Sequence, residues 1–313
     1  MTRNRRALPE DRVLLTDGGL ETTLIFREGI DLPLFAACDL LRTGEGREQL
    51  LAYYDEFARL AVSRETGLLL DTATWRANPD WTDLLGYTPA EFEDLNRTAV
   101  ELAASLRDRY DSPQHPVVIA GVVGPRGDGY QPGTRQSVEE ARAYHSAQIR
   151  VLAEAGADVI EVLTMNYPEE GAGAALAAAD AGIPVLISFT VETDGRLASG
   201  ETLQEAVAFV EDASGGSPAG YLVNCAHPDH LPADLSTGAS WTSRLVGYRA
   251  NASRQSHQEL DEAPVLDDGD PSELGGQVAA LRAQLPGLRV LGGCCGTDFR
   301  HIAAIAERLP ASA

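Results

Sequence analysis

Three of the chain's four cysteines form a pattern that could bind a metal ion. Cys225 directly follows one apolar run that is typical of a strand, and the adjacent Cys294 and Cys295 follow another. Three thiolates can hold Zn²⁺ in a tetrahedral site whose fourth position stays open, which is typical of catalytic rather than structural zinc. We therefore predict that Cys225, Cys294 and Cys295 bind Zn²⁺ and form the catalytic centre.

The glycines beside the adjacent pair would let the backbone bend so that both thiols reach one ion. They are Gly292, Gly293 and Gly296. Other interpretations stay open, because a cysteine after a strand is often a small buried apolar residue. Adjacent cysteines can also form a strained disulfide or act as a redox dithiol. Cys38 has no cysteine nearby in the sequence, and we interpret it as a packing residue.

The elements that must bring these thiols together alternate regularly between strand and helix. Short apolar runs predict eight strands, at residues 13–17, 67–71, 116–121, 158–164, 184–190, 220–224, 244–250 and 288–291. Helix starts are marked by capping boxes at Thr88, Ser137 and Thr202, and by N-caps at Asp270 and Asp298. This order predicts an α/β fold, a (β/α)8 (TIM) barrel, with residues 1–313 as a single domain.

A barrel would place all three cysteines at the carboxyl-terminal rim of its strands. That rim is where barrel enzymes carry their active sites. The irregular stretch 251–270, after the seventh predicted strand, is expected to be an insertion loop at the same rim.

Composition excludes several classes of partner. A formal net charge of −22 would repel a phosphate backbone, so we expect no nucleic-acid partner. The longest apolar runs, such as residues 183–191, are far shorter than a membrane-spanning helix, so we expect no membrane partner. The N-terminal arginines, Arg3, Arg5 and Arg6, are followed by Pro9 and acidic residues rather than by the apolar core of a signal peptide. The small number of cysteines suits a reducing compartment. We therefore predict a cytoplasmic protein. A homo-oligomer is left open.

The open position of such a zinc site points to one type of chemistry. Zinc would deprotonate a thiol that enters the open position and make it nucleophilic without a general base. The thiolate could then attack a methyl group on a positively charged sulfur or nitrogen, whose leaving group departs neutral. The predicted reaction is methyl transfer to sulfur, with a small-molecule thiol as acceptor and a small-molecule methyl donor.

The segment Gly292-Gly293-Cys294-Cys295-Gly296-Thr297, with Asn224-Cys225 upstream, resembles the zinc signature of the homocysteine S-methyltransferase family. Other matches follow in family order along nearly the whole chain: Thr16 to Glu21, Thr72 to Asn78, Gly124-Pro125, Gly156 to Asp158, Ser188-Phe189, and Arg196-Leu197 with Gly200. This resemblance implies a (β/α)8 barrel enzyme that uses zinc to convert homocysteine to methionine.

The resemblance also implies residues that bind the substrate. Asp17 and Gly18 match positions that help bind the amino acid, although Asp-Gly-Gly would also suit a turn. Thr74 could donate to a carboxylate or cap a turn. In the family a glutamate on the fourth strand binds the substrate's amino group, and here Leu163 stands at that position.

Glu161 lies two residues before Leu163 and therefore on the same strand face, so it could point inward and replace the missing carboxylate. A buried glutamate needs a cation or hydrogen-bond donors, and a salt bridge inside the barrel is the equal alternative. Trp75 and Trp81 could wall a pocket for a cationic donor, or they could simply pack. His227 could bind the metal or support a ligand.

The predicted function is a zinc-dependent transfer of methyl from S-methylmethionine or S-adenosylmethionine to homocysteine. The chain is too short to add folate and cobalamin domains, which favours a sulfonium donor, and betaine-type donors stay open. Leu163 keeps two alternatives open: a different thiol or selenol as acceptor, and a non-catalytic barrel that binds zinc or thiols.

Overall fold

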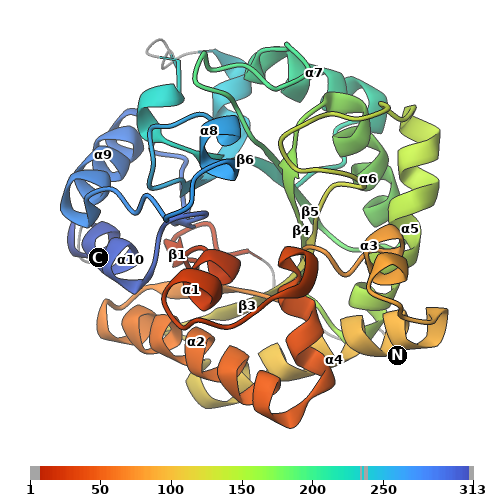
Figure 1. Ribbon diagram of the computed structural model, residues 1–313. Coiled ribbons are helices and arrows are strands. Elements are labelled where there is room, and N and C mark those ends of the chain that lie inside the picture. The colour runs from red at the N-terminus through yellow and green to blue at the C-terminus, as the bar shows by residue number, and fades with distance from the viewer. Residues whose placement is uncertain (1–7, 233–234, 236–238, 310–313) are drawn as a thin grey trace.

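The computed structural model describes residues 8–232, 235 and 239–309, in which eight parallel strands close into a barrel surrounded by helices (Figure 1). The predicted (β/α)8 barrel is confirmed, and neighbouring strands pair in sequence order from β1 to β8, with β8 closing on β1. Arg3, Arg5 and Arg6 lie outside the described residues. No helix within the described ranges is long and apolar enough to cross a membrane.

The strands are β1 (Leu14–Leu15), β2 (Gly67–Asp71), β3 (Val117–Val123), β4 (Val159–Met165), β5 (Val185–Phe189), β6 (Gly220–Ala226), β7 (Leu245–Ala250) and β8 (Val290–Gly293). The α-helices are α1 (Leu20–Phe26), α2 (Gly44–Ser63), α3 (Pro79–Leu84), α4 (Pro89–Tyr110), α5 (Val138–Ala155), α6 (Pro168–Asp180), α7 (Leu203–Ser214), α8 (His257–Asp261), α9 (Pro271–Gln284) and α10 (Phe299–Glu307). Short 3₁₀ helices lie at Pro33–Phe35, Ala37–Arg42, Pro228–His230 and Ser240–Arg244.

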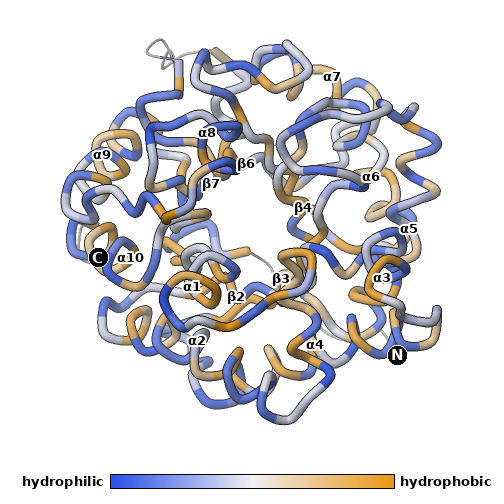
Figure 2. Tube along the Cα trace, viewed as in Figure 1, coloured by the Kyte–Doolittle hydropathy of each residue, from blue (hydrophilic) through white to orange (hydrophobic). Residues whose placement is uncertain are grey.

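Apolar side chains from every strand fill the barrel interior below the rim. They are Leu14, Leu69, Val118, Ala120, Val159, Leu186, Leu222, Val246 and Val290, all buried. A larger apolar layer joins the outer face of the strands to the helices, and Figure 2 shows hydrophobic colour on the helix sides that face the barrel. Because both strand faces are covered, the strands are nearly continuous apolar runs, which is why the sequence reveals them.

The helix starts that the sequence predicts are confirmed. Thr88, Ser137 and Thr202 each accept a hydrogen bond from the backbone N–H three residues later. The glutamate at that later position in turn accepts a hydrogen bond from the backbone N–H of the cap residue. Asp270 and Asp298 cap α9 and α10. Polar caps therefore satisfy first-turn N–H groups of α4, α5, α7, α9 and α10.

Two details of the sequence-based expectation are wrong. Cys225 does not follow the sixth strand but lies inside it, because β6 continues to Ala226. The stretch 251–270 is not irregular throughout, because Ser256 and Glu259 form a capping box that starts α8. A proline-free run with such a box can form one helical turn within a loop.

Replacing the cap of α7 should lower the stability of the fold. Thr202→Ala removes the hydroxyl that accepts from Glu205 N, so the free energy of unfolding in urea should fall by about 1 kcal/mol. Thr202→Ser keeps the oxygen and should stay near wild type. Equal losses in both variants would contradict this role for the cap.

Candidate metal site and substrate pocket

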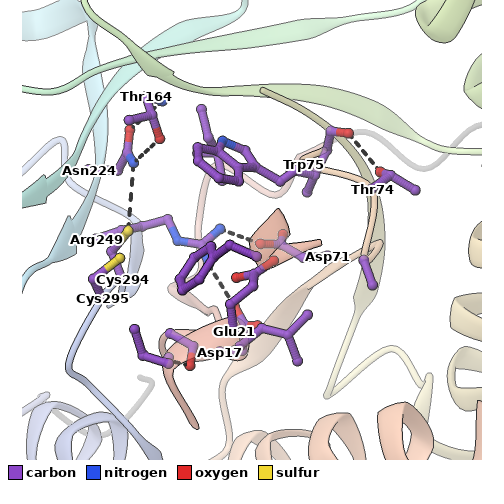
Figure 3. Close-up of a pocket in the computed structure, with 18 of the residues that line it drawn as sticks. Asp17, Glu21, Asp71, Thr74, Trp75, Thr164, Asn224, Arg249, Cys294 and Cys295 are labelled. Carbon is purple, nitrogen blue, oxygen red and sulfur yellow. Dashed lines mark hydrogen bonds and ion pairs between the residues drawn. The ribbon is translucent and has the colours of Figure 1, made fainter. Parts of the chain in front are cut away.

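Cys225, Cys294 and Cys295 lie together at the carboxyl-terminal rim, and their sulfur atoms are all within 4.8 Å of one another. Tetrahedral zinc with Zn–S bonds of about 2.3 Å would place its sulfur ligands about 3.8 Å apart. The cluster is therefore close to the spacing that such an ion needs. All three cysteines are free thiols, and Figure 3 shows Cys294 and Cys295 at the edge of a pocket.

A bulge in β6 lets two consecutive residues face the site. Cys225 has a φ of 55°, and the pairing of β6 with β7 shifts register between Asn224 and Ala226. In a regular strand Asn224 and Cys225 would point to opposite faces, but the bulge breaks this alternation. Asn224 accepts hydrogen bonds from Thr164 N and Ser188 Oγ, and its amide donates to Cys294 Sγ at 3.8 Å.

The turn that carries the adjacent cysteines depends on its glycines in two different ways. Only Gly296 has a left-handed backbone, with a φ of 76°. At Gly292 the need is space, because a side-chain carbon there would lie 1.9 Å from Thr16 Oγ1. Of the three glycines that we expected to let the backbone bend, Gly296 therefore supplies the left-handed residue, whereas Gly292 and Gly293 allow the close approach of neighbouring side chains.

Hydrogen bonds concentrate negative charge on Cys225. Bonds from Cys294 and Cys295 lower the pKa of Cys225 well below its usual range, and the same bonds raise the pKa values of those two thiols. Tyr130 places its hydroxyl oxygen 3.1 Å from Cys225 Sγ and 3.5 Å from Cys295 Sγ. A thiolate with several donors around it is the form of cysteine that binds metals.

His257 contacts the backbone of Cys225, and the sequence analysis did not identify this histidine. Its Nε2 lies 2.7 Å from the Cys225 carbonyl oxygen and its Nδ1 lies 2.8 Å from Glu192 Oε1, while the ring stacks on Tyr130. Both partners are acceptors, so both ring nitrogens donate and the imidazole is charged. Burial works against the charge, but the bonds to Cys225 and Glu192 raise the pKa of His257 to about 10.

His227, which the sequence suggested as a ligand or supporting group, is not part of the cysteine cluster. It is buried, and its Nδ1 accepts a hydrogen bond from Asp229 N. Burial and Arg254 lower the pKa of His227 to about 4, so the ring is neutral. Its observed role is to cap the 3₁₀ helix Pro228–His230.

Below the cysteines, Arg249 holds three buried carboxylates together, and sequence reasoning missed this residue as well. Arg249 Nη2 donates to Asp17 Oδ1 at 2.6 Å, and Nη1 donates to Asp71 and, at 3.2 Å, to Glu161. Its Nε donates to the carbonyl oxygen of Gly293. Figure 3 shows the guanidinium between the cysteines and Asp71. This geometry favours the salt-bridge alternative for Glu161, because Arg249 is the cation that an inward glutamate requires.

One guanidinium does not balance three carboxylates in a buried site. Burial raises the pKa of Glu161 well above its usual range, and the nearby Asp71 carboxylate raises it further. Burial also raises the pKa of Asp17 to about 8, although Arg249 opposes the shift. The cluster therefore retains protons at neutral pH, chiefly on Glu161.

A cavity of about 70 Å³ opens between this charge cluster and the rim. It is large enough for a small molecule, since one water needs about 10–15 Å³. Its walls are lined by Asp17, Gly18, Gly19, Leu20, Glu21, Thr22, Phe35, Tyr54, Asp71, Thr72, Ala73, Thr74, Trp75, Val122, Tyr130, Leu163, Thr164, Asn224, Arg249, Cys294 and Cys295.

The predicted binding residues differ in how they meet this cavity. Asp17, Gly18 and Thr74 line it, but the Thr74 hydroxyl already donates to Val122 O at 2.6 Å. Glu161 is fully buried below the cavity and does not line it. Leu163 faces it, as alternation from Glu161 requires. Their roles toward a substrate stay predictions.

Comparison with known proteins identifies the family. Residues 14–309 match the family model described as homocysteine S-methyltransferase. The chain belongs to the homocysteine S-methyltransferase family. It is therefore a methyltransferase, and its family acts on small molecules.

Relatives of this family match over nearly their whole length. The homocysteine S-methyltransferase of Escherichia coli (strain K12) is 30% identical, over 97% of each chain. The selenocysteine Se-methyltransferase of Brassica oleracea var. italica is 27% identical, over 94% of this chain and 88% of the relative. The solved structure of the homocysteine methyltransferase MmuM from Escherichia coli in its metallated form shares the fold, with a TM-score of 0.73 at 24% identity, covering 95% of this chain and 96% of that one.

Replacing Glu161 with glutamine, which cannot ionise, should change how stability depends on pH. A group whose pKa is raised by folding stabilises the fold fully below its ordinary value, here 4.5, and this stability is lost as pH rises toward the folded pKa. Glu161→Gln has no proton to lose, so it should gain stability relative to wild type as pH rises above about 4.5, by up to about 1.4 kcal/mol per pH unit.

Urea unfolding at pH 5.5 and 7.5 would measure this gain. Glu101→Gln, at an exposed position of α4, should show no such trend. A difference between Glu161→Gln and wild type that is constant or shrinks with pH would show that Glu161 is ionised in the folded protein.

Proposed function

We propose that the chain is a zinc-dependent S-methyltransferase that moves a methyl group from a sulfonium donor, S-methylmethionine or S-adenosylmethionine, to homocysteine. The observation that carries the proposal is the cluster of Cys225, Cys294 and Cys295 at the edge of the cavity. Three protein ligands would leave a fourth position for the acceptor, and the cavity lies directly beside Cys294 and Cys295.

The donor set suits zinc among the metals found in proteins. Thiolates are soft ligands that select zinc over magnesium or calcium, and no described carboxylate or histidine joins the three cysteines. When bound, zinc would lower the pKa of an entering thiol and make its sulfur nucleophilic. Zinc binding requires reduced cysteines, so a cytoplasmic location stays part of the proposal.

The cavity's own side chains fit a positively charged methyl donor. Phe35, Tyr54, Trp75 and Tyr130 give it an aromatic lining, and aromatic faces attract a sulfonium group. Asp17 and Asp71 line its floor, where both pair with Arg249. Trp81 does not line the cavity, so only Trp75 of the two predicted tryptophans is placed to contact a donor.

In the reaction the acceptor sulfur forms a bond to the methyl carbon while the bond between that carbon and the donor sulfonium breaks. The electron pair of the broken bond stays on the donor sulfur, which leaves as a neutral thioether. The chain contributes by holding both sulfur atoms in line and by keeping the site small enough to limit water. No side chain has to transfer a proton in this step.

Leu163 supports a second candidate, a methyltransferase for another thiol or for a selenol. Its apolar side chain lines the cavity where the family resemblance expects a carboxylate. The name of the Brassica relative, a selenocysteine Se-methyltransferase, supports this candidate. A non-catalytic zinc or thiol-binding barrel is the third candidate.

Loss of one ligand should remove the metal. Purified wild-type protein should contain about one zinc per chain by elemental analysis, and Cys294→Ala should contain little or none, because two thiolates bind zinc far more weakly than three. Both the variant and the chelated wild type should fail to methylate thiols. Cys38→Ala, which removes a buried thiol outside the cluster, should retain zinc.

Turnover by the metal-free protein would refute the mechanism. A panel of homocysteine, selenocysteine and simple thiols, each with both sulfonium donors, would separate the first two candidates. A zinc-loaded protein that binds homocysteine but turns over no acceptor with any donor would support the non-catalytic barrel.

A further inference from the structure

Glu21 is the one carboxylate lining the cavity that Arg249 does not bind directly. Asp17 and Asp71, the other two that line it, are both paired with the Arg249 guanidinium. Glu21 makes no ion pair with any residue in the described ranges, and the hydrogen bond that it accepts comes from its own backbone N–H. A half-buried carboxylate without a cation is costly, which points to a positively charged ligand.

The position of Glu21 is fixed by contacts with the cysteine turn. Gly296 N donates to Thr22 Oγ1 at 3.2 Å, and Gly19 N donates to Thr297 O at 2.9 Å. The first turn of α1 therefore lies against the loop that carries Cys294 and Cys295. Figure 3 shows Glu21, Cys294 and Cys295 among the residues that line the same pocket. A thiol acceptor held at these cysteines would extend its remaining groups into the cavity that Glu21 lines.

The electrostatics of Glu21 agree with a missing cation. Burial raises the pKa of Glu21 to about 7, although its own backbone hydrogen bond, Arg76 and Arg249 all act in the opposite direction. Arg76 is already engaged: it stacks on Trp81 and donates to Leu34 O. An ammonium group at this carboxylate would supply both a charge and N–H donors.

An ammonium fits better than a sulfonium at this place. A sulfonium has no N–H to donate and is attracted to aromatic faces, which the cavity provides in Trp75 and Tyr130. An ammonium needs oxygen acceptors. At Leu163, where the family resemblance expects the glutamate that binds the amino group, the cavity wall is apolar and offers none.

We propose that Glu21 binds the α-ammonium group of the acceptor amino acid and so replaces the carboxylate absent at Leu163. The assignment rests on the proposed function, since it takes the acceptor thiol to lie at the cysteine cluster. It makes Glu21 a specificity-determining residue: acceptors with an amino group gain an ion pair that simple thiols lack.

The test compares two acceptors that differ only in the amino group, homocysteine and 4-mercaptobutanoate, on zinc-loaded wild type and Glu21→Gln. Loss of a charged hydrogen bond should lower kcat/KM for homocysteine about 10- to 100-fold. The value for 4-mercaptobutanoate should change less than about threefold, and the KM for the sulfonium donor should stay unchanged. Glu28→Gln, at an exposed position just after α1, is the matched control and should behave as wild type.

Calorimetric binding of the two thiols to the zinc-loaded proteins gives a readout that needs no turnover. Weaker binding of homocysteine alone in Glu21→Gln supports the assignment, even if no donor is found. Equal losses for both thiols, no loss for either, or an effect on the donor alone would overturn it. If wild type turns over neither acceptor but its binding of homocysteine still depends on Glu21, the proposed reaction is overturned and the assignment of Glu21 as the ammonium-binding residue stands.

Discussion

The carboxyl-terminal half of the barrel depends on the ion pairs of Arg249. Its guanidinium contacts Asp17 after β1, Asp71 on β2, Glu161 on β4 and the carbonyl of Gly293 on β8, so one side chain of β7 connects residues of four other strands or their ends. Below this level the barrel is filled by apolar residues from every strand, and above it lies the cavity. Without the guanidinium, three buried carboxylates would face one another, which is strongly destabilising. The cation therefore allows three acidic side chains to form the floor of a buried site.

Local departures from regular strand geometry bring the reactive groups above this floor. Thr164 and Cys225 have left-handed backbones, each at a register shift of its strand. Leu163 and Thr164 thereby both line the cavity, and Asn224 and Cys225 both face the cysteine cluster. A third irregularity, at Val246, turns both Val246 and Gly247 toward the interior and thereby directs Arg249 inward. Non-glycine residues adopt positive φ only where their surroundings stabilise it. The hydrogen bonds of Asn224 to Thr164, Ser188 and Cys294 provide such surroundings.

These irregularities mark the limit of what the sequence could predict. Strand positions and helix caps followed from continuous apolar runs and capping boxes, which are local signals, and the three cysteines followed from strand order. The strict alternation of side chains along a strand placed Glu161 inward correctly. Counted from the inward Val246, the same alternation would place Arg249 outward, and the bulge at Val246 reverses that direction. Tyr130 lies in the loop after β3 and His257 begins α8 after β7, and no pattern within either segment indicates their contacts with Cys225. Contacts between distant loops depend on the folded barrel, so they are invisible to periodicity.

The same arrangement determines where negative charge remains for a ligand. Protons retained by Glu161 and Asp17, together with the charge of Arg249, neutralise most of the floor. Glu21 lies on α1 rather than on a strand, beyond hydrogen-bonding reach of the guanidinium, and its charge is the least compensated in the cavity. A carboxylate on α1, such as Glu21, can contact an ammonium group from a different side than a carboxylate on β4 would. The position on β4 can then be occupied by an apolar residue, here Leu163. A barrel that keeps its thiol chemistry can thus change the residue that recognises the acceptor, because the metal ligands and the ammonium-binding group belong to separate segments.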